Sequence, residues 1–128
     1  MSTEKLCSLR IYLRRGERAG HAQGWLARLF GKPLSAVLVE DALRAGLTYA
    51  SVSNGRMGFG PQGTYVASEV LAEYTAEDLP VCVEVVGPRE ELDAFFVRHR
   101  PELSRAVVVR FDGSVLGSPP TRAQTNVA

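Results

Sequence analysis

The amino-acid sequence predicts one α+β domain of the ferredoxin-like type, in which strands and helices follow the order β-α-β-β-α-β. Two observations lead to this prediction: apolar stretches with strand character, and two helical stretches that each begin at a proline. The 128 residues suffice for one hydrophobic core. Two helices cover only one face of a four-stranded antiparallel sheet, so we expect self-association to cover the other face.

The first strand and the first helix are the clearest elements of the N-terminal half. Residues 8–15 alternate between apolar and polar side chains, as in a strand with one buried face. Residues 32–46 follow helical spacing, with Pro33 suited to the first helical position and Gly46 to the C-terminal stop. Between them lies a loop that ends in a short apolar stretch, 25–31, where we expect one or two helical turns.

The next segments form a strand, a loop and an ambiguous stretch. Residues 47–54 have the Thr, Tyr and Val content of a strand. Residues 55–63 carry four glycines and a proline, which predicts a loop. Residues 64–78 fit helical spacing and strand composition equally well.

The C-terminal half repeats the strand–helix–strand order. Residues 79–87 are dense in valine and predict a strand, and residues 88–100 predict a helix with acids in its first turn and basic residues in its last. The last strand is expected at 105–111. The domain is therefore expected to span 8–111, with 112–128 as a flexible tail.

The side chains on the uncovered face of the sheet follow from strand alternation. We expect this face to carry Tyr12, Cys82 and Val108, beside the charged residues Arg10, Glu84 and Arg110.

The net charge is only +1, so charge alone does not indicate a class of binding partner. Cys7 and Cys82 lie in strand-like runs without metal-ligand spacing, so we expect two buried thiols and no metal site. No apolar run approaches the length of a membrane span, and the N-terminus lacks a signal-peptide pattern, so we expect a cytoplasmic protein without direct membrane insertion. No nucleophile, base and orienting group occur in a catalytic pattern, and we expect no enzymatic activity.

The stretch GFGPQG at 58–63 matches the dinucleotide-binding spacing G-x-G-x-x-G. The predicted strand ends near Asn54, four residues before the first glycine of the motif, and Glu84 lies inside the next strand, so the fingerprint lacks its structural context. The stretch RMGFG also resembles the core motif of RNA-recognition modules. That motif must lie on a strand to display its aromatic residues, and Pro61 and Gly63 would break such a strand. We expect no nucleic-acid binding.

The segment GLTYASVSNGRMGFGPQG, residues 46–63, resembles the part of nitrogen regulatory PII signalling proteins that leads into their long T-loop. The chain is more similar still to a PII-like family, a domain of unknown function related to PII. Five pieces of that family's pattern occur here in order: LRIY at Leu9–Tyr12, GKPL at Gly31–Leu34, AGL at Ala45–Leu47, GFG at Gly58–Gly60 and EDLPV at Glu77–Val81.

The resemblance implies a homotrimer that binds a small anionic effector, an adenine nucleotide, in clefts between subunits. It implies ligand-binding roles for Gly58, Phe59, Gly60 and Gln62, and makes 64–75 largely extended, as one side of a T-loop-like hairpin. PII proteins hold phosphates with a second glycine-rich loop before the last strand. Here the corresponding stretch, 98–105, has no glycine, and Arg100 and Arg105 are the residues expected to supply charge.

The loop itself is expected to contact a membrane transporter or an enzyme through Arg56, Met57, Pro61 and Tyr65. Two other interpretations remain open at this point. The first is a trimeric adaptor without a ligand, whose loop binds its partner constitutively. The second is a cation-responsive trimer like the CutA proteins, for which the sequence shows no clustered metal ligands.

Overall fold

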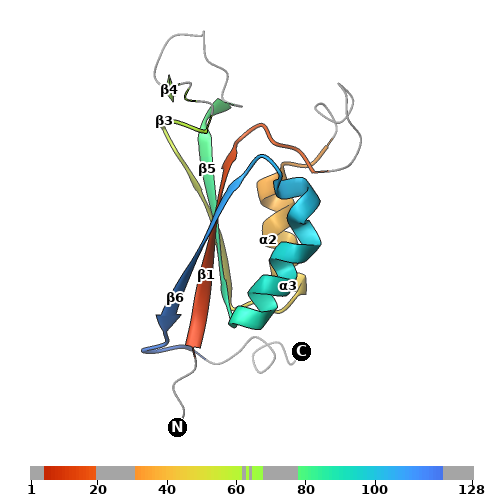
Figure 1. The fold of residues 1–128 in the computed structure, drawn as a ribbon, viewed down its shortest axis with the longest axis vertical. Helices are drawn as coiled ribbons and strands as arrows, with labels where there is room; N and C mark the ends of the chain where they lie inside the picture. Colours follow the sequence, from red (N-terminus) through yellow and green to blue (C-terminus); the bar gives the residue numbers. More distant parts are fainter. Residues whose placement is uncertain (1–4, 20–30, 62, 64, 68–77, 120–128) are drawn as a thin grey trace.

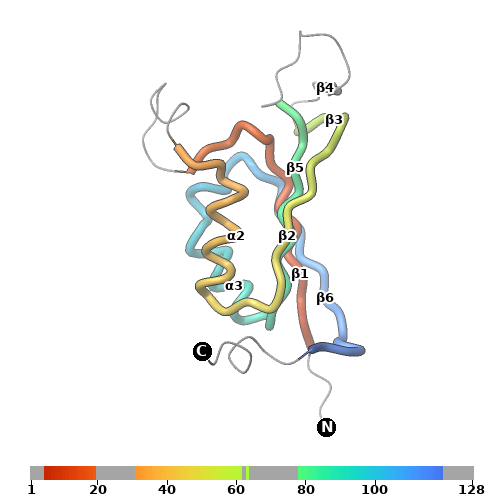
Figure 2. Tube along the Cα trace, turned by 180° about the vertical axis from the view of Figure 1, so that it is seen from behind, coloured from red at the N-terminus to blue at the C-terminus, as the bar shows by residue number. Residues whose placement is uncertain are grey.

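The protein is described here from a computed structural model, which covers residues 5–19, 31–61, 63 and 78–119, together with the backbone of residues 65–67. Four strands form an antiparallel sheet in the order β2-β5-β1-β6, and β3 and β4 form a separate two-stranded hairpin. Figures 1 and 2 show both long helices on the same side of the sheet. The elements are β1 (Lys5–Arg14), α2 (Leu34–Arg44), β2 (Tyr49–Asn54), β3 (Met57–Phe59), β4 (Tyr65–Ala67), β5 (Pro80–Gly87), α3 (Arg89–His99), the 3₁₀ helix η2 (Arg100–Leu103) and β6 (Val107–Ser114).

The sheet topology confirms the predicted β-α-β-β-α-β fold class. Strand β1 lies in the centre, where it pairs with β5 on one side and with β6 on the other. Ile11 of β1 stands opposite both Val83 and Val108. Strand β2 pairs with the far side of β5, so β2 and β6 form the two edges of the sheet.

The hydrophobic core lies between the sheet and the two helices. The inward side chains of β1 and β5 alternate with outward ones, and Ile11 and Val83 are completely buried. Leu38 of α2 and Leu92 of α3 are also completely buried against them. Removing one such aliphatic side chain from water stabilises a fold by about 1.5–3 kcal/mol, so this face fixes the arrangement of the helices.

Both helices begin next to the predicted prolines, one position later than expected. Pro33 and Pro88 occupy the N-cap positions, and neither helix has a side-chain cap. Backbone contacts serve the start of α2 instead: the Leu34 amide donates to the Glu17 carbonyl at 2.8 Å, and the Ala36 amide donates to the Pro33 carbonyl at 3.1 Å. These bonds hold the loop after β1 against the first turn of α2.

The prediction for the uncovered face was right for Tyr12 and wrong for Val108. Val108 stands opposite Ile11, on the helix side, where it packs against the core. Val107 and Val109 instead share the uncovered face with Tyr12. The predicted strand was in place, but its side chains were assigned with the opposite alternation.

The last strand is longer than expected, because β6 continues to Ser114. Residues 112–114 are therefore part of the sheet and do not belong to a tail. Asp112 stands opposite Cys7 and accepts a hydrogen bond from its thiol at 3.1 Å. Residues 120–128 lie outside the described part, and a flexible C-terminal segment there stays a prediction.

Two other expectations fall largely outside the described residues. Residues 25–30, expected to make a helical turn, are not described. Of the ambiguous stretch 64–78, residues 65–67 form β4, which is the extended structure that the resemblance implied, and residues 68–77 are not described.

Candidate functional site

The glycine-rich segment forms a hairpin at one end of the main sheet (Figure 1). Its strands β3 and β4 pair so that Gly58 stands opposite Val66 and Phe59 opposite Tyr65. The side chains of Met57 and Phe59 are 57% and 71% exposed. The hairpin therefore offers two apolar side chains to the surroundings.

The predicted loop residues fall on this hairpin as far as it is described. Arg56, Pro61 and Gly60 are exposed. Gln62 and the side chain of Tyr65 lie outside the described residues. At the tip, the Gly63 amide donates to the Gly60 carbonyl at 2.8 Å, and Gly63 adopts a φ of +79° that favours glycine.

The base of the hairpin packs closely against Pro80, the first residue of β5. The Gly55 amide donates to the Pro80 carbonyl at 2.8 Å, and a Cβ at Gly55 would lie 2.6 Å from Pro80 Cγ. A Cβ at Gly58 would lie 3.2 Å from the same atom, at a φ of +155° that side chains rarely adopt. Close packing therefore favours glycine at position 55, and the backbone conformation favours it at position 58, whatever ligand the loop binds.

The predicted charge-bearing residues Arg100 and Arg105 lie at the same end of the sheet as the hairpin. The antiparallel pairings place the end of β2 and the start of β6 at that end. However, β2 and β6 are the opposite edges of the sheet. Three strand spacings lie between them, which is a distance of roughly 14 Å. Both arginines are exposed, and the Arg100 guanidinium lies 5.3 Å from the centre of the Phe96 ring. One chain alone does not bring the two halves of the predicted site together.

The face of the sheet opposite the helices carries large exposed apolar residues. They come from three strands and comprise Tyr12, Tyr49, Val107, Val109 and Phe111, each 36–55% exposed. Between them, Arg10 bonds to Glu84 at 3.2 Å and lies 4.9 Å from the centre of the Phe111 ring. We call this surface the open face. Exposed apolar side chains that gather on one face are typical of protein–protein contact surfaces.

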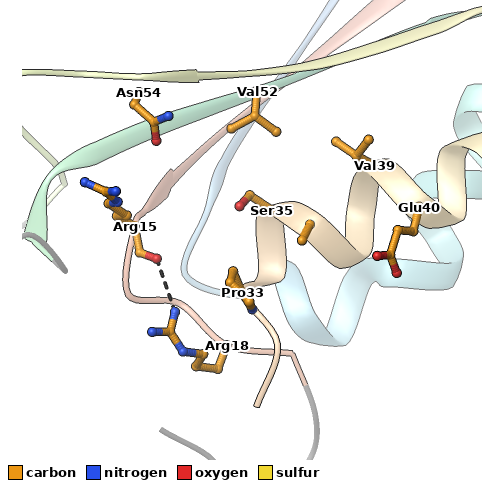
Figure 3. Close-up of a pocket in the computed structure, with 9 residues that line it drawn as sticks. Arg15, Arg18, Pro33, Ser35, Val39, Glu40, Val52 and Asn54 are labelled. Carbon is orange, nitrogen blue, oxygen red and sulfur yellow. Dashed lines mark hydrogen bonds between the residues drawn. The ribbon is translucent and has the colours of Figure 1, made fainter. Parts of the chain in front are cut away.

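A separate groove of about 610 Å³ lies on the helix side of the β2 edge (Figure 3). It is lined by residues from three elements: Arg15 and Arg18 from the loop after β1, Ser35 and Val39 from α2, and Val52 and Asn54 from β2. None of the predicted site residues lines it. Sequence reasoning missed the groove because its parts are about 20 residues apart in the chain and share no motif.

The two cysteine thiols, of Cys7 and Cys82, are structural in character. The hydrogen bond to the Asp112 carboxylate, together with burial, raises the pKa of the Cys7 thiol. Burial raises the pKa of the Cys82 thiol. Both thiols therefore stay protonated at neutral pH, which makes them poor nucleophiles.

His99 is the one polar residue buried in the core among the described residues. Its Nδ1 lies 3.1 Å from Glu102 Oε1, and its Nε2 lies 3.2 Å from Asp41 Oδ2 without the alignment of a hydrogen bond. The described residues contain no group of His, Cys, Asp and Glu side chains arranged to hold a metal ion. Nor does any helix in the described part have the length and apolarity to cross a membrane.

Comparison with solved structures finds the same fold in PII-like proteins. The chain resembles CPII, a nitrogen regulatory PII-like protein from Thiomonas intermedia K12, in a structure bound to ADP, AMP and bicarbonate. The TM-score is 0.59 at 17% identity, over 89% of this chain and 91% of that chain. A second CPII structure, bound to ADP and bicarbonate, gives a TM-score of 0.56 at 18% identity with the same coverage. The apo form of CPII gives 0.52 at 16% identity, over 93% of this chain and 98% of that chain.

Comparison of the sequence with protein families agrees with the fold. Residues 6–113 match the family DUF190, described as "Uncharacterized ACR, COG1993". The match spans both helices and all four strands of the main sheet except Lys5 of β1 and Ser114 of β6. The chain therefore belongs to the DUF190 family, and it shares its ferredoxin-like fold with PII-like proteins.

Proposed function

We propose that the protein is a non-enzymatic PII-like regulator. In this proposal it is a homotrimer that senses an adenine nucleotide between subunits and controls a transporter or an enzyme through its 55–65 loop. One observation carries the proposal: the hairpin and the arginines of 100–105 lie at one end of the sheet but on opposite edges, with the open face between them.

The open face supports the trimer. A face with two tyrosines, two valines and a phenylalanine in partial contact with water gains free energy when a second copy covers it, at about 25 cal/mol per Å² of apolar area removed from water. Cyclic association is the common way for one face to be covered in a closed assembly. In such a ring the β2 edge of one subunit comes next to the β6 edge of its neighbour.

That arrangement would complete the nucleotide site. The hairpin base would contribute Gly58, Phe59, Gly60 and Gln62, and the neighbouring subunit would contribute Arg100 and Arg105. Exposed amides of a glycine-rich loop bind phosphate oxygens, and guanidinium groups pair with them in two parallel hydrogen bonds. The similar protein CPII has been seen with ADP and AMP bound, which supports an adenine nucleotide as the effector.

The loop would transmit the signal. Met57 and Phe59 are exposed apolar side chains of the kind that anchor protein–protein contacts. Arg56, Pro61 and Tyr65 would complete the partner-binding surface. A nucleotide that binds one loop conformation more tightly shifts the population toward it, and thereby changes the affinity for the partner.

The proposal is tested first by mass and by ligand titration. Light scattering gives the subunit number, and thermal unfolding is followed with AMP, ADP, ATP, cyclic nucleotides and bicarbonate. A nucleotide present at a hundred times its Kd should stabilise the native state by about 2.7 kcal/mol and raise the Tm. Arg105→Gln should abolish this rise, whereas Arg89→Gln, at the other end of the sheet, should leave it intact.

Mixed trimers test whether two subunits build each site. Phe59→Asp removes the hairpin half and Arg105→Glu removes the arginine half, so neither homotrimer should bind the nucleotide. When the two variants are co-expressed and the mixed trimers isolated, about one interface in three should pair an intact hairpin with an intact arginine. Recovery of roughly a third of the nucleotide binding supports the shared site; no recovery in correctly assembled mixed trimers contradicts it.

A ligand-free adaptor is the second candidate, and the exposed Met57 and Phe59 favour it. It predicts a trimer whose Tm responds to none of the nucleotides and whose partner binding depends on Met57 and Phe59 with or without a nucleotide. The same titration therefore separates the two functions.

A further inference from the structure

We propose that the groove between α2 and β2 binds a small organic monocarboxylate, with its carboxylate at Arg15 and its hydrocarbon body against Val39 and Val52 (Figure 3). This site lies on the helix side of the β2 edge, away from the open face, and does not depend on the proposed nucleotide site. Its volume of about 610 Å³ falls within the range of small-molecule sites, roughly 300–1,000 Å³.

The polar end of the groove has the chemistry of a carboxylate site. Arg15, Ser35 and Asn54 line the same groove, and Figure 3 shows the Ser35 hydroxyl directed toward the side of the groove where Arg15 and Asn54 are drawn. A guanidinium is a planar donor that matches both oxygens of a carboxylate. The Asn54 amide and the Ser35 hydroxyl add further donors.

The Arg15 guanidinium differs from its neighbour in having no protein acceptor among the described residues. Arg14, one residue earlier, points to the other side of the sheet and pairs with Glu17 at 3.4 Å and Asp78 at 3.5 Å. Arg15 contacts the loop through its backbone, because its carbonyl accepts a hydrogen bond from the Arg18 guanidinium at 3.4 Å. Arg18, which also lines the groove, therefore lies beside the Arg15 backbone.

The first turn of α2 adds to this positive potential. It carries no acidic residue and no side-chain cap, so neither offsets the partial positive charge of the helix N-terminus. Ser35 lies in that turn, and its hydroxyl faces the end of the groove that holds Arg15. The helix therefore reinforces the preference for an anion that the arginine and the amide establish.

The rest of the groove selects the body of the ligand. Val52 is 38% exposed and Val39 is partly buried, and Figure 3 shows both in the wall beyond Ser35. Glu40 lines the far end, where Lys32 at 3.4 Å and Arg44 at 4.0 Å already pair with its carboxylate. A second negative group on the ligand would meet Glu40, so the groove favours one carboxylate on an apolar body over a di-acid.

Amide NMR of the full chain, titrated with sodium benzoate at constant ionic strength, tests this assignment. Acetate carries the carboxylate without the body, and benzyl alcohol carries the body without the carboxylate. We expect saturable shifts at Ser35, Val39 and Asn54 with benzoate, and binding at least tenfold tighter than for either comparison compound. Non-saturable shifts, or equal binding of all three compounds, would overturn the assignment.

Variants locate the charge. Arg15→Gln should weaken benzoate binding at least tenfold, because a charge-assisted pair of hydrogen bonds is lost. Arg14→Gln removes the same charge one residue away and should leave benzoate binding unchanged. Val52→Thr should weaken the binding of benzoate but not that of acetate.

Equal loss of benzoate binding in Arg14→Gln and Arg15→Gln would show that benzoate responds to general positive charge and would reject the site. Benzoate binding without any nucleotide response would keep this inference and remove the proposed nucleotide function.

Discussion

At the scale of single residues, His99 connects three elements of the core. It ends α3, its ring lies 4.6 Å from the ring of Phe95, and its two nitrogens approach carboxylates from α2 and η2. Sequence reasoning interpreted this histidine only as a basic residue at a helix end. The contact between His99 and Asp41 could not be predicted from the sequence. The two residues are 58 positions apart, and no sequence motif links the helices that carry them.

We expect His99→Ala to lower the free energy of unfolding by about 2–3 kcal/mol, because it leaves a cavity and two carboxylates without their neighbour. Urea unfolding measures the change. Glu91→Ala, at an exposed position of the same helix, should cost less than about 0.5 kcal/mol. Equal losses in the two variants would show that His99 adds nothing beyond helix propensity.

Because the pKa values of the Cys7 and Cys82 thiols are raised, we expect the folded protein to lose stability in alkaline solution. In the unfolded chain they ionise near 9.0, and in the folded chain their pKa values are raised. Above about pH 9 the unfolded state therefore holds fewer protons, so unfolding becomes easier as the pH rises toward the folded-state pKa values. The slope is at most about 1.4 kcal/mol per pH unit for each thiol.

Urea unfolding between pH 8 and 10.5 measures this slope, with Cys7→Ala/Cys82→Ala as the comparison. The double variant should lose stability less steeply with pH, whatever its stability at pH 8. Parallel slopes would mean that the folded-state pKa values are not raised.

At the scale of elements, the sequence predicted both helices and the four sheet strands, and failed where alternation is absent. Residues 107–109 are three valines in a row, so hydrophobicity does not indicate which of them face the core. Pairing decides it, because Val108 stands opposite the buried Ile11. The strand's end was missed for a related reason: Asp112 and Gly113 are typical turn residues, but here they pair with Cys7 and Leu6.

The hairpin base yields a prediction at this scale. Gly55→Ala should destabilise the protein by about 1–3 kcal/mol, because its Cβ would overlap Pro80. Pro80→Ala removes the Cγ atom and should restore part of the loss in the double variant, which a double-mutant cycle measures. Gly117→Ala, where a Cβ meets no atom, serves as the control. Strictly additive losses would contradict this contact.

At the scale of the whole molecule, the sequence predicted an uncovered face and a glycine-rich loop, but not their relation. The loop and Arg105 are 40 or more residues apart, and only the sheet order shows that they occupy opposite edges. The α2–β2 groove was not predicted at all, since Arg15, Ser35 and Asn54 become neighbours only through the crossing of three segments.

The open face predicts how the assembly breaks. We expect Val107→Asp to convert the proposed trimer to a folded monomer, because it places a charge on the surface that association would bury. Val97→Asp makes the same change at a 59% exposed position of α3 and should leave the mass unchanged. Light scattering and circular dichroism measure mass and folding. A trimeric Val107→Asp would place the subunit contact elsewhere.

The position of β1 in the centre of the sheet has a consequence for biosynthesis. This strand leaves the ribosome before both of its partners, β5, which begins at residue 80, and β6, which ends at residue 114. At translation rates of roughly 5–20 residues per second, β1 waits several seconds or more for its neighbours. During that time its apolar side chains have no sheet to join, which leaves them open to premature association.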